Sequence, residues 1–312
     1  MSEMDKNSLA LFCDAHFHLL PSEEALQGLP FLLGRAVTAA HSPQEFLAQE
    51  ARVQALEKTD CQVKPGNDSP RERTSELFPC HNAAKRQNDK SSAPGNDKGE
   101  RNLLQSFGLH PQAPFLDERD FALRLEFLEG LLQEKRIAAI GECGYDFFTP
   151  EFSAKRAAQE KAFAAQLDLA ARHKVPVIVH ARKAMQEIFA AAGALKEVPA
   201  VVFHSFAGSP ADARSLLSKG INAYFSFGKP IVNGAKKAIN CVRALQIERL
   251  LFETDAPYQT LKGEKATSPA EIADVYQAAF ELRTAGIPYE ARPSFVDFCG
   301  AIEKNFSRAF LC

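Results

Sequence analysis

Short runs of apolar, β-branched and aromatic residues recur along the chain, separated by segments with helical periodicity. Amphipathic stretches such as residues 153–174 and 268–286 predict helices, and several open on Ser-Pro or Ser-x-x-Glu start signals. Eight strands alternating with helices predict an α/β fold of the parallel (β/α)8 TIM-barrel type. The predicted strands are residues 9–19, 34–40, 103–111, 137–145, 175–182, 200–208, 221–228 and 249–257.

A segment at about residues 60–101 interrupts this alternation. It has few large apolar residues, nearly balanced charges, and the tetrapeptide Pro-Gly-Asn-Asp twice. Such a composition buries too little apolar surface to offset the entropy lost on ordering, so we expect a disordered surface insertion. Its Cys80-His81 pair lacks companion ligands at zinc-finger spacing. We therefore expect residues 1–312 to form a single barrel domain that this insertion interrupts.

The first predicted strand is unusual because polar side chains occupy one of its faces. Alternation along an extended chain places Asp14, His16 and His18 on one face, and Cys13, Ala15 and Phe17 on the other, towards the helices. The two imidazoles then lie about 6 to 7 Å apart along the strand, close enough to bind one ion. Asp14 sits deeper, so we assign it to bracing an imidazole or a neighbouring strand.

Metal-binding residue types also end most of the other strands, at the rim where the active sites of such barrels lie. We interpret His41, which follows the second strand, as a solvated loop residue. Several histidines and two carboxylates exceed what one tetrahedral ion needs, so we predict a two-metal centre with Glu142 as the bridge. Such a centre suits hydrolysis of an ester or phosphoester. The rim residues are His16, His18, His110, Glu142, His180, His204 and Asp255.

Composition and charge narrow the possible partners. The chain has 46% hydrophobic and 24% charged residues, as in ordinary globular proteins. Its net charge of -2 provides no global attraction for nucleic acid, so phosphate recognition requires a local patch or bound metal. The seven cysteines form no Cys-x-x-Cys pair, which favours buried, reduced thiols. With neither a signal peptide nor a membrane span in the sequence, we expect a cytoplasmic protein without an obligate protein partner.

Six ordered motifs resemble those of the TatD family of metal-dependent deoxyribonucleases, which are amidohydrolase-like barrel enzymes. The resemblance covers nearly the whole chain outside the insertion. The motifs are Asp-Ala-His-Phe-His at 14–18, GLHP at 108–111, GECGYD at 141–146, PVIVHAR at 176–182, HSFAG at 204–208 and ETDAPY at 253–258. The metal ligands that the resemblance implies are His16, His18, Glu142, His180, His204 and Asp255.

The resemblance also implies roles in catalysis and substrate binding. Asp255 would take the proton of the attacking water, and Glu142 would act with it as a catalytic residue. Arg182 would hold a phosphate oxygen bidentately, or else form an ion pair at the rim. His110 would either touch the substrate or brace the rim. Apart from the resemblance, Lys229 on the loop after the seventh strand is a further candidate for holding the DNA backbone.

Three positions depart from the usual family pattern. Lys183 stands where an acidic residue is common, and Gln112 where a histidine is common. Thr267 and Ser268 precede a proline where relatives commonly show Asn-Glu. None of these changes removes an implied ligand, so they bear on the substrate rather than on the hydrolytic chemistry.

The leading hypothesis is a hydrolase that uses two divalent ions, Mg²⁺, Mn²⁺ or Zn²⁺, to cleave phosphodiester bonds of DNA. By resemblance it would be a 3'-5' exonuclease on single strands. One alternative is a related barrel hydrolase acting on another ester, an amide or a lactone. The other is a non-catalytic metal-binding paralogue whose insertion docks a partner.

Overall fold

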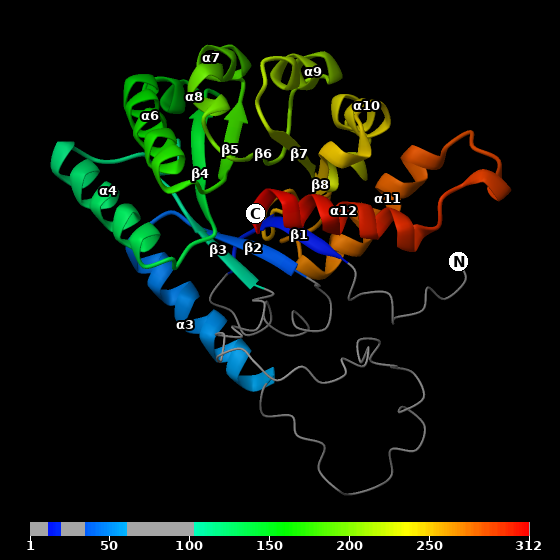
Figure 1. Ribbon diagram of the computed structural model, residues 1–312, viewed down its shortest axis with the longest axis horizontal. Helices are drawn as coiled ribbons and strands as arrows, with labels where there is room; N and C mark the ends of the chain where they lie inside the picture. The colour runs from blue at the N-terminus through cyan, green and yellow to red at the C-terminus, as the bar shows by residue number, and fades with distance from the viewer. Residues whose placement is uncertain (1–11, 20–34, 61–102, 312) are drawn as a thin grey trace, which may run out of the picture.

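The computed structural model describes residues 12–19, 35–60 and 103–311. Its strands form one parallel sheet in which each strand pairs with its neighbours in chain order, as predicted (Figure 1). They are β1 Cys13–Phe17, β2 Arg35–Ala40, β3 Leu103–Phe107, β4 Ala139–Asp146, β5 Val177–Arg182, β6 Val201–Phe203, β7 Ala223–Phe227 and β8 Leu250–Phe252.

The ends of β1 and β8 come together and nearly close the sheet into a barrel. The backbone N–H of Asp255 donates to the carbonyl of His16 at 3.0 Å, and that of His18 donates to the carbonyl of Ala256 at 2.8 Å. Eight parallel strands with helices between them are the predicted (β/α)8 architecture.

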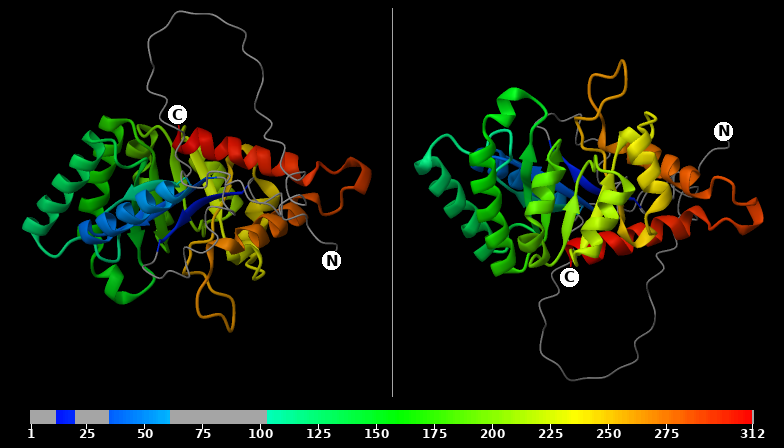
Figure 2. Two further views of the ribbon diagram at one scale, coloured as in Figure 1. Left: turned by 90° about the horizontal axis from the view of Figure 1, so that it is seen from below. Right: turned by 90° about the horizontal axis from the view of Figure 1, so that it is seen from above.

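Helices surround the strands (Figures 1 and 2). The predicted start signals are present, because Ser209 and Ser268 both form capping boxes at the first turns that follow them. The stretch predicted as one helix at 153–174 is divided between α5 and α6. The helices are α3 Pro43–Asp60, α4 Glu118–Gln133, α5 Pro150–Ser153, α6 Arg156–His173, α7 Met185–Ala190, α8 Ala192–Lys196, α9 Pro210–Ser218, α10 Lys236–Ala244, α11 Ile272–Thr284 and α12 Phe295–Phe310, with short 3₁₀ turns η2 Lys229–Ile231, η3 Ile247–Arg249, η4 Pro269–Glu271 and η5 Tyr289–Ala291.

An extra residue in β1 changes which of its side chains face inward. The pairing of β1 with β2 shifts by one residue between Asp14 and Phe17. Before the shift, Cys13 and Ala15 pack in a buried layer. Each of the seven remaining strands also contributes a side chain to this layer, so it lies inside the barrel. The prediction that Cys13 and Ala15 face the helices was wrong, because one extra residue reverses the alternation.

After the shift, the end of β1 has the orientation that the sequence predicted. Phe17 packs outward against Val53 of α3, which leaves His16 and His18 on the inner side. Asp14 accepts hydrogen bonds from the backbone N–H of Thr254 at 3.1 Å and from its hydroxyl at 2.6 Å. Asp14 thus braces the segment after β8, one of the two roles expected for it.

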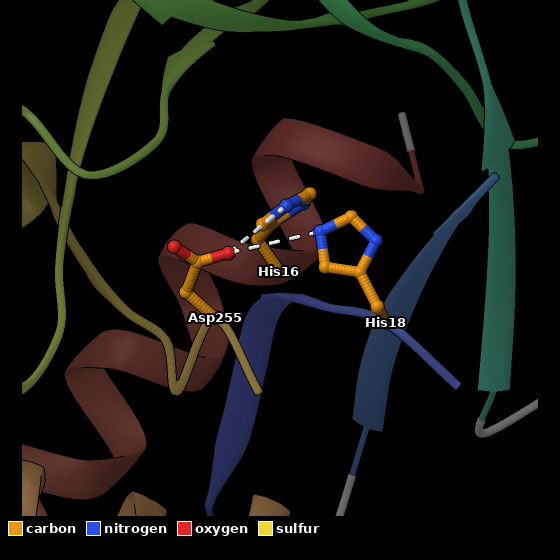
Figure 3. Close-up of side chains that lie close together, drawn as sticks. All are labelled: His16, His18 and Asp255. Carbon is orange, nitrogen blue, oxygen red and sulfur yellow. Dashed lines mark ion pairs between the residues drawn. The ribbon is translucent and has the colours of Figure 1, made fainter. Parts of the chain in front are cut away.

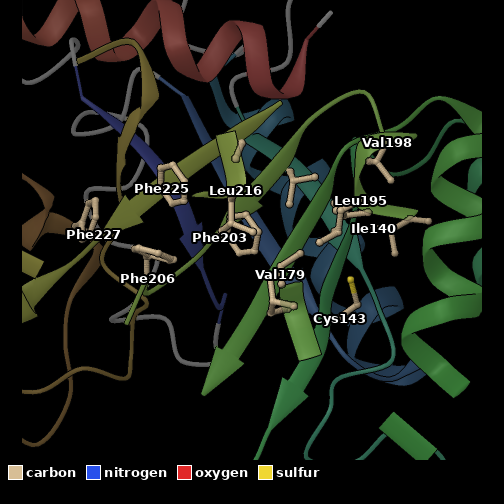
Figure 4. Packing of buried hydrophobic residues seen from close by; sticks show 14 of the residues in the cluster. Ile140, Cys143, Val179, Leu195, Val198, Phe203, Phe206, Leu216, Phe225 and Phe227 are labelled. Atoms are coloured by element: carbon tan, nitrogen blue, oxygen red, sulfur yellow. The ribbon is translucent and has the colours of Figure 1, made fainter. Parts of the chain in front are cut away.

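Apolar packing on both sides of the strands holds the barrel rigid. Outward-facing Val179 and Phe203 pack with Leu195 of α8 and Leu216 of α9 (Figure 4). Inside, the buried layer is closed by Phe306 and its neighbours on α12, drawn in red against the strands (Figure 2). Because apolar side chains fill this lower part of the barrel, polar side chains remain for the carboxyl ends of the strands.

Other expectations concern the insertion, the thiols and membranes. The proposed insertion lies outside the described residues, between the end of α3 and the start of β3. The four described cysteines are buried and unpaired, and burial raises the pKa of Cys13 to about 12, so its thiol is inert. Among the helices of the described ranges, none is both long enough and apolar enough to cross a membrane.

The packing of α12 yields a stability prediction. Phe306 is fully buried in the inner layer, so Phe306→Ala should lower the free energy of unfolding by about 3–5 kcal/mol. Tyr289→Ala is the control, because that ring is 84% exposed and its loss should change stability by no more than about 0.5 kcal/mol. Urea denaturation measures both variants, and equal stability for the two would contradict an apolar seal at Phe306.

Candidate metal centre

The carboxylate of Glu142 is buried at the centre of the site. The pairing of β4 with β5 shifts between Gly141 and Cys143, so Glu142 is the extra residue of a β-bulge. Gly141 permits this close packing, since a Cβ there would lie 2.6 Å from the Cβ of Ile178. The bulge turns the Glu142 side chain into the barrel beside the apolar layer rather than towards the helices.

One oxygen of this carboxylate faces three imidazoles. Oε1 lies 3.0 Å from Nε2 of His16, 3.2 Å from Nε2 of His18 and 3.1 Å from Nε2 of His41. These residues come from the end of β1 and from the position just after β2. Strands at the start of the chain therefore supply the donors on this side.

The other oxygen faces three more imidazoles. Oε2 lies 2.7 Å from Nε2 of His204, 3.3 Å from Nδ1 of His180 and 3.4 Å from Nε2 of His110. Their strands are β6, β5 and β3, so the donors of the two sides arrive from different parts of the barrel. Glu142 thus lies between two sets of imidazoles, as expected of a bridging ligand.

Asp255 adds a second carboxylate on the side of His16 and His18 (Figure 3). Its Oδ1 lies 3.6 Å from Nε2 of His16 and 3.7 Å from Nε2 of His18. Its Oδ2 accepts a hydrogen bond from the side-chain amide of Gln259 at 2.9 Å, and the same amide group donates to Ser205. Gln259 therefore fixes the direction in which the Asp255 carboxylate points.

Asp146 orients the imidazole of His180. Its Oδ2 lies 3.0 Å from Nε2 of His180 and accepts a hydrogen bond from the side chain of Gln112 at 2.9 Å. A proton on Nε2 that is donated to Asp146 leaves the lone pair of His180 on Nδ1. That Nδ1 is the atom that faces Glu142 and lies 3.0 Å from Nε2 of His204. A carboxylate behind a ligating histidine is the usual support in protein metal sites.

The electrostatics of the site favour a bound cation. Burial would raise the pKa of Glu142, but the imidazoles of His204, His16 and His110 hold it well below its usual range. Burial lowers the pKa of His16 and that of His110 to about 4, so both rings are neutral and offer lone pairs. Burial would also lower the pKa of His204, yet the Glu142 carboxylate raises it to about 10. The carboxylate therefore stabilises positive charge at its side.

The donor set fits divalent metal ions. Within the described ranges, Nε2 of the fully buried His16 makes no aligned hydrogen bond, although it lies 3.0 Å from Oε1 of Glu142. A buried polar atom without a partner costs about 1–3 kcal/mol, and a cation would remove that cost. Two ligands about 2.1 Å from one ion lie roughly 3 Å apart, which matches the contacts around Glu142. The described residues contain four groups of three such donors, and within each group the ligand atoms lie within 4.8 Å of one another. Three of these groups include Glu142.

The predicted site residues are brought together at one place. Most of them line a cavity of about 480 Å³, whereas His16 lies fully buried beside it. Arg182 stands at the edge with 44% of its side chain exposed, and its Nη1 lies 3.9 Å from Oδ2 of Asp146. Those that line the cavity are His18, His110, Glu142, His180, Arg182, His204 and Asp255.

Two sequence interpretations need correction. His41 is no solvated loop residue, because its imidazole joins the site beside Glu142; its position at the carboxyl end of a strand was the signal. Lys229 cannot reach substrate, since its Nζ is buried 2.5 Å from the carboxylates of both Glu264 and Glu271. It fixes the loop after β8 to η4.

Other contributing residues gave weaker signals in the sequence. Asp146 ends the motif that contains Glu142, but its contact with His180 depends on the pairing of β4 with β5. No pattern pointed to Gln259, whose side chain reaches back to Asp255 from the loop after β8. Tyr258 lines the cavity with 58% of its surface exposed and contacts His18 edge-on.

The chain resembles known proteins over nearly its whole length. Residues 13–310 match the family model described as TatD-related DNase. A protein described as the 3'-5' ssDNA/RNA exonuclease TatD of Cronobacter sakazakii is 35% identical over 152 residues, which are 48% of this chain and 56% of that protein. The uncharacterized metal-dependent hydrolase YabD of Bacillus subtilis is 31% identical over 190 residues, 58% of this chain and 70% of that protein. The match thus spans little more than half of the Cronobacter protein.

Solved structures share the fold. The TatD homologue YJJV of Escherichia coli K12 has a TM-score of 0.70 at 24% identity, covering 97% of this chain and 99% of the other. A TatD-family hydrolase of Entamoeba histolytica has a TM-score of 0.65 at 16% identity, covering 96% of this chain and 97% of the other. These likenesses confirm the barrel architecture.

The position of His41 yields a test of the metal centre. If His41 contributes a donor, His41→Ala should weaken binding of Mn²⁺ or Zn²⁺ by roughly 10-fold or more. His173→Ala is the matched control, because His173 ends α6 outside the cavity and contacts only Glu129 among the acidic groups described. Isothermal titration of the metal-depleted protein measures both affinities. Unchanged affinity in His41→Ala would show that its imidazole is not a ligand.

Proposed function

The chain belongs to the TatD-related DNase family, and from that premise we propose that it hydrolyses phosphodiester bonds in nucleic acid with divalent metal ions. Relatives described as 3'-5' ssDNA/RNA exonucleases support single-stranded ends as the substrate. The observation that carries the proposal is the buried Glu142 carboxylate between two sets of imidazoles. This arrangement suits two-metal hydrolysis of a phosphodiester.

The proposed centre holds two ions, one on each side of Glu142. His16, His18 and Asp255 would hold the first ion, and His180 and His204, whose ring nitrogens lie 3.0 Å apart beside Glu142, would hold the second. Divalent ions at such a site lower the pKa of a water molecule and offset the charge of the phosphodiester. Imidazole-rich donors favour Zn²⁺ or Mn²⁺ over Mg²⁺, which prefers oxygen ligands.

Asp255 is the proposed proton acceptor. Its carboxylate is at the cavity wall, and the Gln259 amide holds it in one orientation. A carboxylate placed beside the attacking water takes the proton as the new bond to phosphorus forms. His110, neutral and 3.4 Å from Glu142, is positioned to touch the substrate or to add a donor on the Oε2 side.

Arg182 is the proposed phosphate-binding residue. Its guanidinium is partly exposed at the cavity edge, and its contact with Asp146 is a long one. Several N–H donors are therefore available for phosphate oxygens, which a guanidinium binds bidentately. Since the chain has a net charge of -2, such local groups must supply the attraction for a polyanion.

Metal content and cleavage should depend together on the bridging carboxylate. We expect two ions per wild-type chain and fewer in Glu142→Ala, with cleavage of single-stranded DNA lost, because neither ion retains its shared ligand. Elemental analysis and a gel assay on end-labelled DNA measure the two quantities. Glu118→Ala is the control, since that side chain is 77% exposed on α4.

The same assay discriminates between the alternatives. A wild-type protein that binds ions and leaves single-stranded DNA intact while hydrolysing a lactone, amide or other ester would favour the related-hydrolase reading. A protein that binds ions and hydrolyses none of these would favour the non-catalytic paralogue. Full cleavage by Glu142→Ala would exclude Glu142 as an essential bridge.

A further inference from the structure

An exposed aromatic ring contacts two cations beside the metal centre. Phe148, just after β4, is 49% exposed although it is a large apolar side chain. The guanidinium carbon of Arg182 lies 3.9 Å from the centre of its ring, and Nζ of Lys183 lies 4.7 Å from it. We propose that Phe148, Arg182 and Lys183, together called the Phe148 platform, stack the base of a nucleotide next to the scissile phosphodiester.

The Phe148 platform is held in fixed register with the metal centre. The backbone N–H of Phe148 donates at 2.8 Å to Oδ1 of Asp146, whose other oxygen orients His180. The backbone N–H of Phe147 donates to the carbonyl of Arg182 at 2.9 Å, which extends the pairing of the neighbouring strands β4 and β5 (Figure 1). A base on the ring would therefore have a defined position relative to His180 and the metal centre.

The platform is also continuous with the cavity. Arg182 both lines the cavity and covers part of the Phe148 ring, so one side chain contacts both regions. A guanidinium that stacks on a ring still presents its N–H groups at its edge and a flat surface on its outer side. Arg182 can thus bind a phosphate while the adjoining base stacks on the exposed surface of the platform.

The charges around the ring suit a polyanion. Lys183 stands one residue after Arg182, and Lys155 donates at 2.7 Å to the carbonyl of Gln112, a residue that lines the cavity. Within the described part of the chain, neither lysine forms an ion pair, so their charges are not neutralised by neighbouring carboxylates. Cationic side chains beside an exposed ring are the combination that binds single strands, whose bases are free to stack.

The occupant we infer is a base of single-stranded nucleic acid, because a duplex keeps its bases stacked on one another and a small ester has no base. This inference rests on the proposed nuclease function. Every nucleobase has a flat face that can stack on a ring. The platform should therefore tolerate any base and recognise the single strand rather than its sequence.

Binding can be followed without cleavage by the fluorescence of one introduced tryptophan, because the chain itself contains none. Phe148→Trp introduces one indole at the platform, and Tyr289→Trp introduces one at an exposed position on η5 as the control. Both metal-loaded variants are titrated with a phosphorothioate single strand that resists hydrolysis. We expect quenching of fluorescence in Phe148→Trp and little change in Tyr289→Trp. Equal responses from the two variants would overturn the platform.

Removal of a base provides the matching kinetic test. Phe148→Ala should lower kcat/KM on an ordinary oligonucleotide by about 5- to 100-fold, the usual worth of one stacked base. Two further oligonucleotides carry an abasic sugar, one at the terminal position and one at the next. The oligonucleotide that lacks the stacked base should be cleaved equally by Phe148→Ala and wild type. That pattern identifies the stacked base, and simple damage to the protein would not produce it.

The possible failures are distinguishable. If Phe148→Ala cleaves ordinary and abasic strands as well as wild type does, the platform is wrong and the nuclease function stands. If Phe148→Ala is equally impaired on every strand, its effect is structural and the platform is also wrong. If wild type cleaves none of the strands under any metal, the proposed function fails, and the platform fails with it.

Discussion

The site depends on burying one charged carboxylate. Taking Glu142 out of water costs several kcal/mol unless opposite charge and hydrogen-bond donors surround it. Among the described residues, six imidazoles lie within 3.4 Å of its oxygens, and the carboxylate raises the pKa of one of them, His204, to about 10. The strand ends must therefore converge closely, and much of the fold can be understood as a means of holding them there.

Two irregularities in the strands produce that convergence. One extra residue in β1 lets Cys13 and Ala15 fill the barrel while His16 still points inward. One extra residue in β4 likewise turns the Glu142 side chain into the barrel. Below this level the inner layer is apolar and sealed by α12, so a rigid support carries the polar rim. Asp146 fixes the position of Phe148 relative to the metal centre, because its carboxylate contacts both His180 and the backbone of Phe148.

Periodicity and residue type were enough to predict the eight strands, their order and the rim on which the candidate ligands gather. Strand alternation did not predict that Cys13 and Ala15 face the barrel interior. A bulge reverses the alternation in β1, and it arises from packing against strands that are distant in the sequence. Lys229 looked available beside β7, but its partners Glu264 and Glu271 lie far along the chain. His41 was within reach of sequence reasoning, since the rule that places active sites at carboxyl strand ends applied to it as well.

The most direct measurement of the central claim is anomalous diffraction from crystals grown with Mn²⁺ or Zn²⁺. The account predicts two anomalous peaks about 4 Å apart on opposite sides of the Glu142 carboxylate. One peak should lie among His16, His18 and Asp255, and the other between His180 and His204. A single peak, or two peaks that do not share Glu142 as a ligand, would contradict the bridged centre.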